Sequence, residues 1–136
     1  MFYSVTGKII KTFASAVAVE CSGVAFKINT SLNTLKKIGG EGNKATLYTY
    51  LSVREDALDL FGFCDEDELE CFKLLISVSG VGPKAALSIL SLLTPESLAL
   101  AVASGDAKAV TKAQGVGPKI AERVVRELMG KLSSFE

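Results

Sequence analysis

The hydrophobic positions follow two different periods along the chain. Up to residue 63 they lie in short stretches rich in valine, isoleucine, phenylalanine and threonine, which predicts strands over 2–12, 15–23, 24–31, 45–56 and 57–63. Leu32, Leu35 and Ile38 have helical spacing and are followed by two glycines, so a short helix is expected after the third strand. Three strands, a helix and two strands is the order of a five-stranded OB-fold β-barrel.

From residue 64 onward the period is helical. Acidic residues open a helix over 65–78, whose apolar positions are 69, 72, 75 and 76. Further helices are predicted over 83–93, 94–104, 105–113 and 118–132, with Thr94 as an N-cap and Pro95 at the first helical position. The change of period predicts an α+β chain of two domains, a barrel at 1–63 and an all-α domain at 64–136.

Composition narrows the possible functions. The 136 residues are 49% hydrophobic and 22% charged, as in a folded soluble protein, and no apolar run approaches the ~20 residues that span a bilayer. We therefore expect no membrane partner, and the start of the chain lacks the pattern of a signal peptide. Cys21, Cys64 and Cys71 are odd in number and lack C-x-x-C spacing, which is typical of reduced thiols in a cytoplasmic protein.

The absence of histidine excludes histidine-based acid–base catalysis and Cys/His zinc sites. The charges balance, with 15 basic and 15 acidic residues, which argues against a general polycation. Binding to DNA remains open, because affinity follows the local placement of lysine and arginine rather than their total. The two groups of charges would then have to lie on different faces.

One phrase occurs twice, as SGVGPKA from Ser79 and QGVGPKI from Gln114. The first copy fits the loose dinucleotide-binding pattern, but that pattern needs a preceding strand and a βαβ unit, and helices surround both copies. The P-loop pattern is absent, so ATP hydrolysis is not expected. The sequence predicts no cofactor.

In a helical setting the phrase suits an anion. The glycines permit a turn with positive φ and leave amides uncovered, and the proline after them starts a helix whose positive end faces the loop. Lys84 and Lys119 lie in that first turn, where a lysine opposes the helix dipole, so an anionic ligand explains them better than a structural role. The alternative is a pair of tight interhelix turns with exposed lysines.

The repetition points to a ligand with matching symmetry. Two equivalent loops can be related by a pseudo-twofold axis, as are the two backbones of a DNA duplex. Phosphate contacts of this kind fix position without reading bases. Sequence-independent binding of a duplex follows as a hypothesis.

The tandem loops resemble paired helix-hairpin-helix motifs. Together with the N-terminal barrel and the stretch SVREDALDLFGF, they make the chain similar to the RuvA family of Holliday-junction branch-migration subunits over essentially its whole length. Helix-hairpin-helix loops also occur in glycosylases, ligases and repair nucleases. The order of barrel, REDA tip, LFGF and two hairpins is the specific part of the resemblance.

The resemblance implies a non-catalytic subunit that holds Holliday-junction DNA open as a homotetramer, with an octamer on DNA as the alternative. The implied DNA-binding positions are Ser79, Gly80, Val81, Gly82, Lys84, Gln114, Gly115, Val116, Gly117 and Lys119. Arg123, one turn into the following helix, is either a further phosphate contact or a solvated residue.

The REDA tip matches the family's acidic pin, here Glu55 and Asp56. Carboxylates at a hairpin tip repel phosphates, and four pins would carry about eight negative charges where the strands cross. Taken without the family, the same residues form an ordinary polar turn. Arg54 beside them is expected either to hold a separated strand or to pair with an acid of the pin.

Relatives continue into a small helical domain that docks the hexameric ATPase RuvB, and the junction resolvase is a further implied partner. The sequence ends at Glu136, so residues 1–136 are expected to bind and shape junctions without recruiting the motor. Two other functions stay open: a helix-hairpin-helix nuclease or glycosylase, and a protein-interaction barrel. The acidic run at 65–68 is interpreted as helix N-terminal acids rather than a metal site.

Overall fold

The computed structural model describes residues 1–135. The chain divides into two compact units, Met1–Leu69 and Glu70–Glu136, and the division falls inside helix α2 (Glu66–Ile76). The first unit is a β-barrel and the second is helical, so the predicted α+β class and barrel-then-helices order are confirmed.

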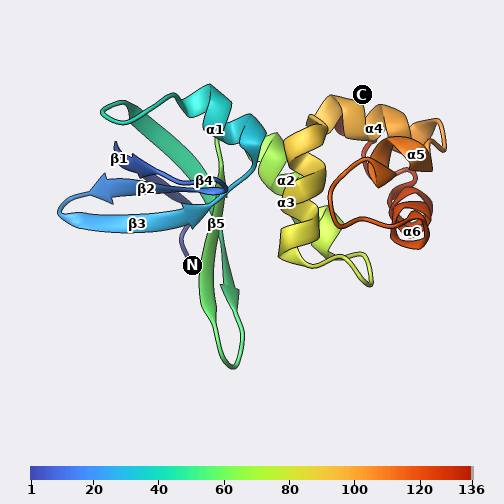
Figure 1. Cartoon of the computed structure of the whole chain (residues 1–136), viewed down its shortest axis with the longest axis horizontal. Helices are drawn as coiled ribbons and strands as arrows, with labels where there is room; N and C mark the ends of the chain where they lie inside the picture. Colours follow the sequence, from blue (N-terminus) through green and yellow to red (C-terminus); the bar gives the residue numbers. More distant parts are fainter. Residues whose placement is uncertain (136) are drawn as a thin grey trace. The chain divides into compact units, whose positions relative to one another are not determined.

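The first unit is a closed five-stranded barrel (Figure 1). Its strands are β1 (Ser4–Thr12), β2 (Ala16–Cys21), β3 (Val24–Asn29), β4 (Lys44–Val53) and β5 (Leu58–Phe63), in the order β1-β2-β3-β5-β4. The neighbours pair antiparallel except β3 and β5, which close the barrel in parallel. A turn at Ser22-Gly23 connects β2 and β3, and both residues have positive φ.

The barrel interior follows from alternation along the strands, which sends every second side chain inward. Its buried cluster is Val5, Ile9, Val17, Val19, Ile28, Ala45 and Leu47. Two strand glycines allow close approach: a Cβ at Gly7 would lie 2.0 Å from the Glu20 carbonyl oxygen, and one at Gly62 would lie 2.7 Å from Ile28 Cγ2. A larger residue at either position would push strands of the barrel apart.

Helix α1 (Leu32–Ile38) lies between β3 and β4, and a buried carboxylate holds its start. Ser31 caps α1 by accepting the Thr34 amide, and the Ser31 hydroxyl in turn donates to Glu68 Oε2 at 2.7 Å. The Thr34 hydroxyl donates to the other carboxylate oxygen and accepts the Cys64 amide. The acids at 65–68 lie at the start of α2 as expected, where Asp65 Oδ1 accepts the Glu68 amide at 2.7 Å; Glu68 is also buried, with 2% of it exposed.

The second unit contains the rest of α2, then α3 (Pro83–Leu92), α4 (Pro95–Ala103), α5 (Ala107–Thr111), α6 (Pro118–Leu128) and the 3-10 turn Ser133–Phe135. Thr94 caps α4 by accepting the Ser97 amide at 3.1 Å, as predicted. The apolar face of α6 is buried at Ala121, Val124, Val125 and Leu128. Within residues 1–135, no single helix has the length and apolar character to cross a membrane. Helices α3 and α4 reach that length and apolar character only when taken together, and they are bent by 96° relative to each other.

Candidate nucleic-acid interface

The two copies of the repeated phrase fold into the same hairpin. In the first, the Val81 amide donates to the Val78 carbonyl at 3.0 Å, and in the second the Val116 amide donates to the Ala113 carbonyl at 3.2 Å. Val81 and Val116 are each 5% exposed, so their side chains are buried beneath the hairpins. Any ligand therefore meets the backbone at these positions rather than the valine side chains.

The two glycines of each hairpin have different backbone conformations. Gly80 and Gly115 have φ of 91° and 81°, the left-handed conformation that favours glycine. Gly82 and Gly117 were also expected to support a positive-φ turn, but they are extended N-caps with φ of −89° and −83°. A Cβ at either would meet nothing within 4 Å, so the fold of the chain does not require glycine there.

Glycine at the N-cap leaves the start of the helix bare. Neither Gly82 nor Gly117 supplies a side-chain cap, and the proline that follows each has no amide hydrogen. The first helical acceptor is the N-cap carbonyl, which receives the amide of Ala86 or Ala121 at 3.0 Å. The earlier amides find no acceptor among residues 1–135, namely those of Gly82, Lys84 and Ala85 and of Gly117, Lys119 and Ile120.

Reciprocal hydrogen bonds join the two hairpins. The Ser88 hydroxyl of the first motif donates to the Gln114 carbonyl of the second at 2.7 Å, and Arg123 Nη1 of the second donates to the Ser79 carbonyl of the first at 2.7 Å. Ser88 and Arg123 occupy equivalent positions in the repeat, as do Ser79 and Gln114. Such an exchange between equivalent positions is the bonding of a twofold interface. We call these two bonds the clasp.

A surface cavity of about 570 Å³ lies where the motifs meet. Its lining combines the start of α3 with the second loop, and consists of Gly82, Lys84, Ala85, Ser88, Gln114 and Gly115. The structure thus brings predicted residues of both copies around one hollow. Lys84 and Lys119 are both exposed, so their ammonium groups can reach a ligand.

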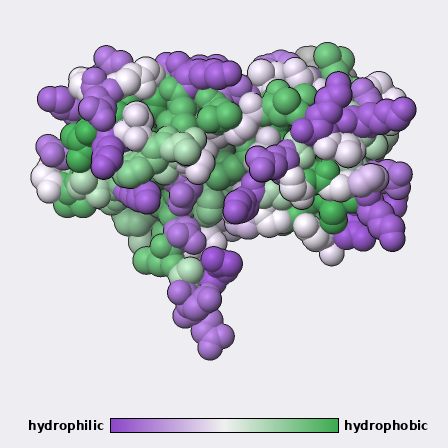
Figure 2. Space-filling model, viewed as in Figure 1, coloured by the Kyte–Doolittle hydropathy of each residue, from purple (hydrophilic) through white to green (hydrophobic). Residues whose placement is uncertain are grey.

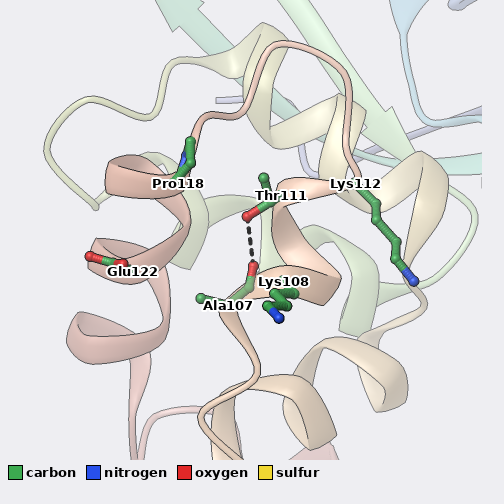
Figure 3. A pocket seen from close by; sticks show the side chains of 6 residues that line it. All are labelled: Ala107, Lys108, Thr111, Lys112, Pro118 and Glu122. Atoms are coloured by element: carbon green, nitrogen blue, oxygen red, sulfur yellow. Dashed lines mark hydrogen bonds between the residues drawn. The ribbon is translucent and has the colours of Figure 1, made fainter.

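A second hollow, of about 420 Å³, opens beside the second hairpin between α5 and α6 (Figure 3). Lys108 of α5 and Lys112, which directly follows α5, line one side, and Pro118 and Glu122 line it from α6. The repeat explains the opening: the positions equivalent to Ala107, Thr111 and Glu122 carry the larger apolar residues Phe72, Ile76 and Leu87 in the first motif. The two motifs therefore have similar loops but differ in the side chains at these positions beside the hairpin.

The REDA tip joins β4 to β5, and the Arg54 amide closes the turn on the Ala57 carbonyl at 2.9 Å. The hairpin extends beyond the other strands of the barrel (Figure 1), and its far end is hydrophilic (Figure 2). Glu55 and Asp56 are exposed at this tip. Arg54 pairs with Asp59 Oδ2 of β5 at 3.6 Å, and not with an acid of the tip.

Two protein families match the chain, one over the barrel and one over the helices. The family described as RuvA N terminal domain matches residues 1–62, and the family described as SAM-like Helix-hairpin-helix tandem matches residues 72–129. The Holliday junction branch migration complex subunit RuvA of Alkaliphilus metalliredigens is 42% identical over 136 residues, which are 100% of this chain and 70% of that protein. The chain belongs to the RuvA family.

Other RuvA proteins are similar to the same extent. The subunit of Acetivibrio thermocellus is 48% identical over 97% of this chain, and that of Ruminiclostridium cellulolyticum is 41% identical over 98% of it. The chain spans 65% of the length of the first of these and 67% of the second. The likeness covers both the barrel and the hairpins.

Sequence reasoning on this RuvA-family chain missed Ser88 and the hydrogen bond of Arg123 to Ser79. Arg123 Nη1 donates to the Ser79 carbonyl and its Nε lies 4.0 Å from Glu127, and its contact with phosphate stays a prediction. Ser88 carries no charge and belongs to no motif. Its equivalence to Arg123 in the repeat was the one sequence feature that could have indicated its role. Among the described residues, no group of three or more acidic, cysteine or histidine side chains could hold a metal.

Proposed function

We propose that the chain binds Holliday-junction DNA through the phosphate backbone, without reading its bases, as a non-catalytic subunit of a branch-migration complex. The observation that carries this proposal is the pair of bare helix starts at Gly82 and Gly117. Each offers three amides without an acceptor in the described chain beside an exposed lysine, and a phosphate supplies the acceptors and the charge that both need.

The twofold relation of the motifs supports a duplex arm as the ligand. The reciprocal clasp relates the hairpins as the two strands of a duplex are related across a groove. The relatives are named as Holliday junction branch migration complex subunits, which identifies the four-way junction as the DNA to test. The residues we assign to phosphate are Ser79 to Gly82 and Lys84 in one motif, and Gln114 to Gly117 and Lys119 in the other.

The acidic tip is assigned the shaping of the junction. In the proposed homotetramer, Glu55 and Asp56 of four subunits approach the crossover and repel the phosphates that would otherwise collapse onto one another. The ATPase RuvB is the proposed motor and the junction resolvase a further proposed partner.

Exchanging Glu55 for glutamine and Asp56 for asparagine removes this repulsion and keeps the shape of the turn. Binding to a four-way junction should stay equal or tighten, while gel mobility and donor–acceptor distances between labelled arms show a less open junction. Loss of binding in this variant would contradict a repulsive tip.

The direct test of the proposed function compares a labelled four-way junction with a linear duplex of the same sequence, and then with a junction of unrelated sequence. The junction should bind more tightly than the duplex, and the two junctions should bind equally. A marked preference for one sequence contradicts backbone recognition. Cleavage of either DNA in magnesium would favour the nuclease alternative.

A further inference from the structure

The β4–β5 hairpin has one aliphatic face that runs from the barrel interior to the acidic tip. Leu47, Thr49, Leu51 and Val53 alternate onto the same face of β4, opposite Gly62, Leu60 and Leu58 of β5. The register pairs Leu51 with Leu60 and Val53 with Leu58. Four aliphatic side chains therefore lie together on the part of the hairpin nearest the tip.

Burial falls steadily along this face. Leu47 is 0% exposed and Thr49 is 6% exposed, whereas Val53 is 70% and Leu58 is 68% exposed. The same face that forms barrel core at its base is uncovered two residues before Glu55. Figure 2 shows hydrophobic surface on the projecting hairpin between the barrel and the hydrophilic end. We call Val53 and Leu58 the collar.

Next to the tip the opposite face of the hairpin is polar, whereas nearer the barrel it carries the Tyr50–Phe61 pair. Ser52 pairs in register with Asp59, and Arg54 forms its ion pair with Asp59. The collar is thus one side of a two-faced ribbon, and not part of a uniformly apolar loop. An exposed cross-strand pair of this kind gains free energy when another apolar surface covers it.

The neighbouring charges decide what can cover the collar. A second copy packed collar to collar would bring Glu55 and Asp56 of both chains together with no DNA between them, and the like charges would oppose that contact. A DNA phosphate meets the same repulsion. The face of an unpaired base is flat, apolar and uncharged, so it is the part of a junction that can approach the collar.

We propose that the collar contacts the faces of bases that have lost their partners at the crossover, as apolar wedges do when they enter a base step. This proposal rests on the proposed function, and it adds a base contact to a tip otherwise assigned to repulsion. The acids at the tip keep the backbones apart, and the collar stabilises the bases while they are unpaired.

The test uses Val53→Thr with Leu58→Gln, which makes the collar polar while it keeps side chains of similar size. The readout is permanganate oxidation of thymines placed at the crossover, because permanganate attacks unstacked thymine. Reactivity of the bound junction should change by about threefold or more, while affinity stays within about twofold because phosphate contacts supply it. Val24→Thr is the control, since Val24 is also exposed (54%) at the end of a barrel hairpin.

Unchanged permanganate reactivity in the collar variant, with normal junction binding, overturns the base contact. A fall in the molar mass from light scattering, with no such fall for Val24→Thr, shows instead that a second copy covers the collar and also overturns it. Failure of the unmodified chain to bind junctions would count against the proposed function, so the two failures are distinguishable.

Discussion

At the scale of single residues, Gly82 and Gly117 are N-cap positions where the fold does not require glycine but the proposed ligand does. Serine, threonine, aspartate and asparagine are the usual N-caps because their oxygens accept the first free amides of a helix. Both positions have an ordinary extended backbone and open space for a side chain, yet both are glycine. A ligand that uses the amides itself accounts for that choice.

Gly82→Asp combined with Gly117→Asp should therefore have opposite effects on folding and binding. The new carboxylates cap α3 and α6, so the free energy of unfolding in urea should rise by a few tenths of a kcal/mol per site. Affinity for a labelled junction should fall by about tenfold or more, because the carboxylates occupy the amides and repel phosphate. Gly40→Asp is the control, as Gly40 is also an open position without positive φ. Equal losses of affinity in the two proteins would contradict the assignment.

Glu68 shows how a polar residue of the acidic run became part of a core. Both of its oxygens accept hydroxyl hydrogens, because Ser31 and Thr34 use their own oxygens as acceptors for amides. Burial raises the pKa of this carboxyl above its usual value, and the hydrogen bonds from Thr34 and Ser31 oppose the rise without cancelling it. Glu68 therefore takes up a proton more readily in the folded chain than in the unfolded chain.

This shift fixes the sign of a pH effect. Because the pKa of Glu68 is higher in the folded chain than its unfolded value of 4.5, its stabilising contribution is complete below that value and is lost as pH rises through the folded pKa. Urea unfolding between about pH 4 and pH 8 should show the stability of the chain falling relative to Glu68→Gln as pH rises. A gain in the stability of the chain relative to Glu68→Gln as pH rises would contradict the burial argument.

At the scale of elements, the clasp makes each hairpin depend on the helix of the other. Gly80 allows this approach, since a Cβ there would lie 2.7 Å from Ile120 Cδ1 and 3.1 Å from Arg123 Nη1. Glycine at this position therefore serves the left-handed turn and also the close contact with α6. The two motifs form one binding element rather than two independent loops.

Arg123→Met should loosen the first hairpin, although Arg123 belongs to the second motif. Loss of the bond to Ser79 should cost about 0.5–1.5 kcal/mol of stability and speed hydrogen exchange at the Val81 amide. Ser88→Ala should act on the Val116 amide in the same way. Arg126→Met is the matched control, since Arg126 is exposed on the same helix. If hydrogen exchange at the Val81 amide is unchanged in DNA-free Arg123→Met, Arg123 does not stabilise the first hairpin, and the prediction is contradicted.

The elements were largely predictable because local patterns determine them. The alternating strands, the Thr94 cap and the Ser22-Gly23 turn all depend on residues close in sequence. The clasp, the ion pair of Arg54 and the burial of Glu68 join residues whose proximity only the tertiary fold creates. The backbone of Gly82 also differed from expectation, because a GxG phrase does not show which glycine bears the positive φ.

At the scale of the whole molecule, the proposal divides the work between the barrel and the helical unit. Residues 1–63 and 64–136 stay the proposed domains, and the contact of Glu68 with Ser31 and Thr34 lies within the first compact unit, Met1–Leu69. The hairpins hold phosphates, the acidic tip repels them, and the collar meets bases. Every one of these roles depends on the first, because junction DNA must be held before it can be shaped.

The most direct test of that first role is the salt dependence of junction affinity for the unmodified chain and for Lys84→Ala with Lys119→Ala. The logarithm of the affinity should fall linearly with the logarithm of salt concentration, with a slope of about −0.9 for each phosphate neutralised. The double variant should bind more weakly to junctions of any sequence, and its slope per bound chain should be shallower by about 2. A slope and an affinity equal to those of the unmodified chain would contradict the assignment of the repeated hairpins to the phosphate backbone.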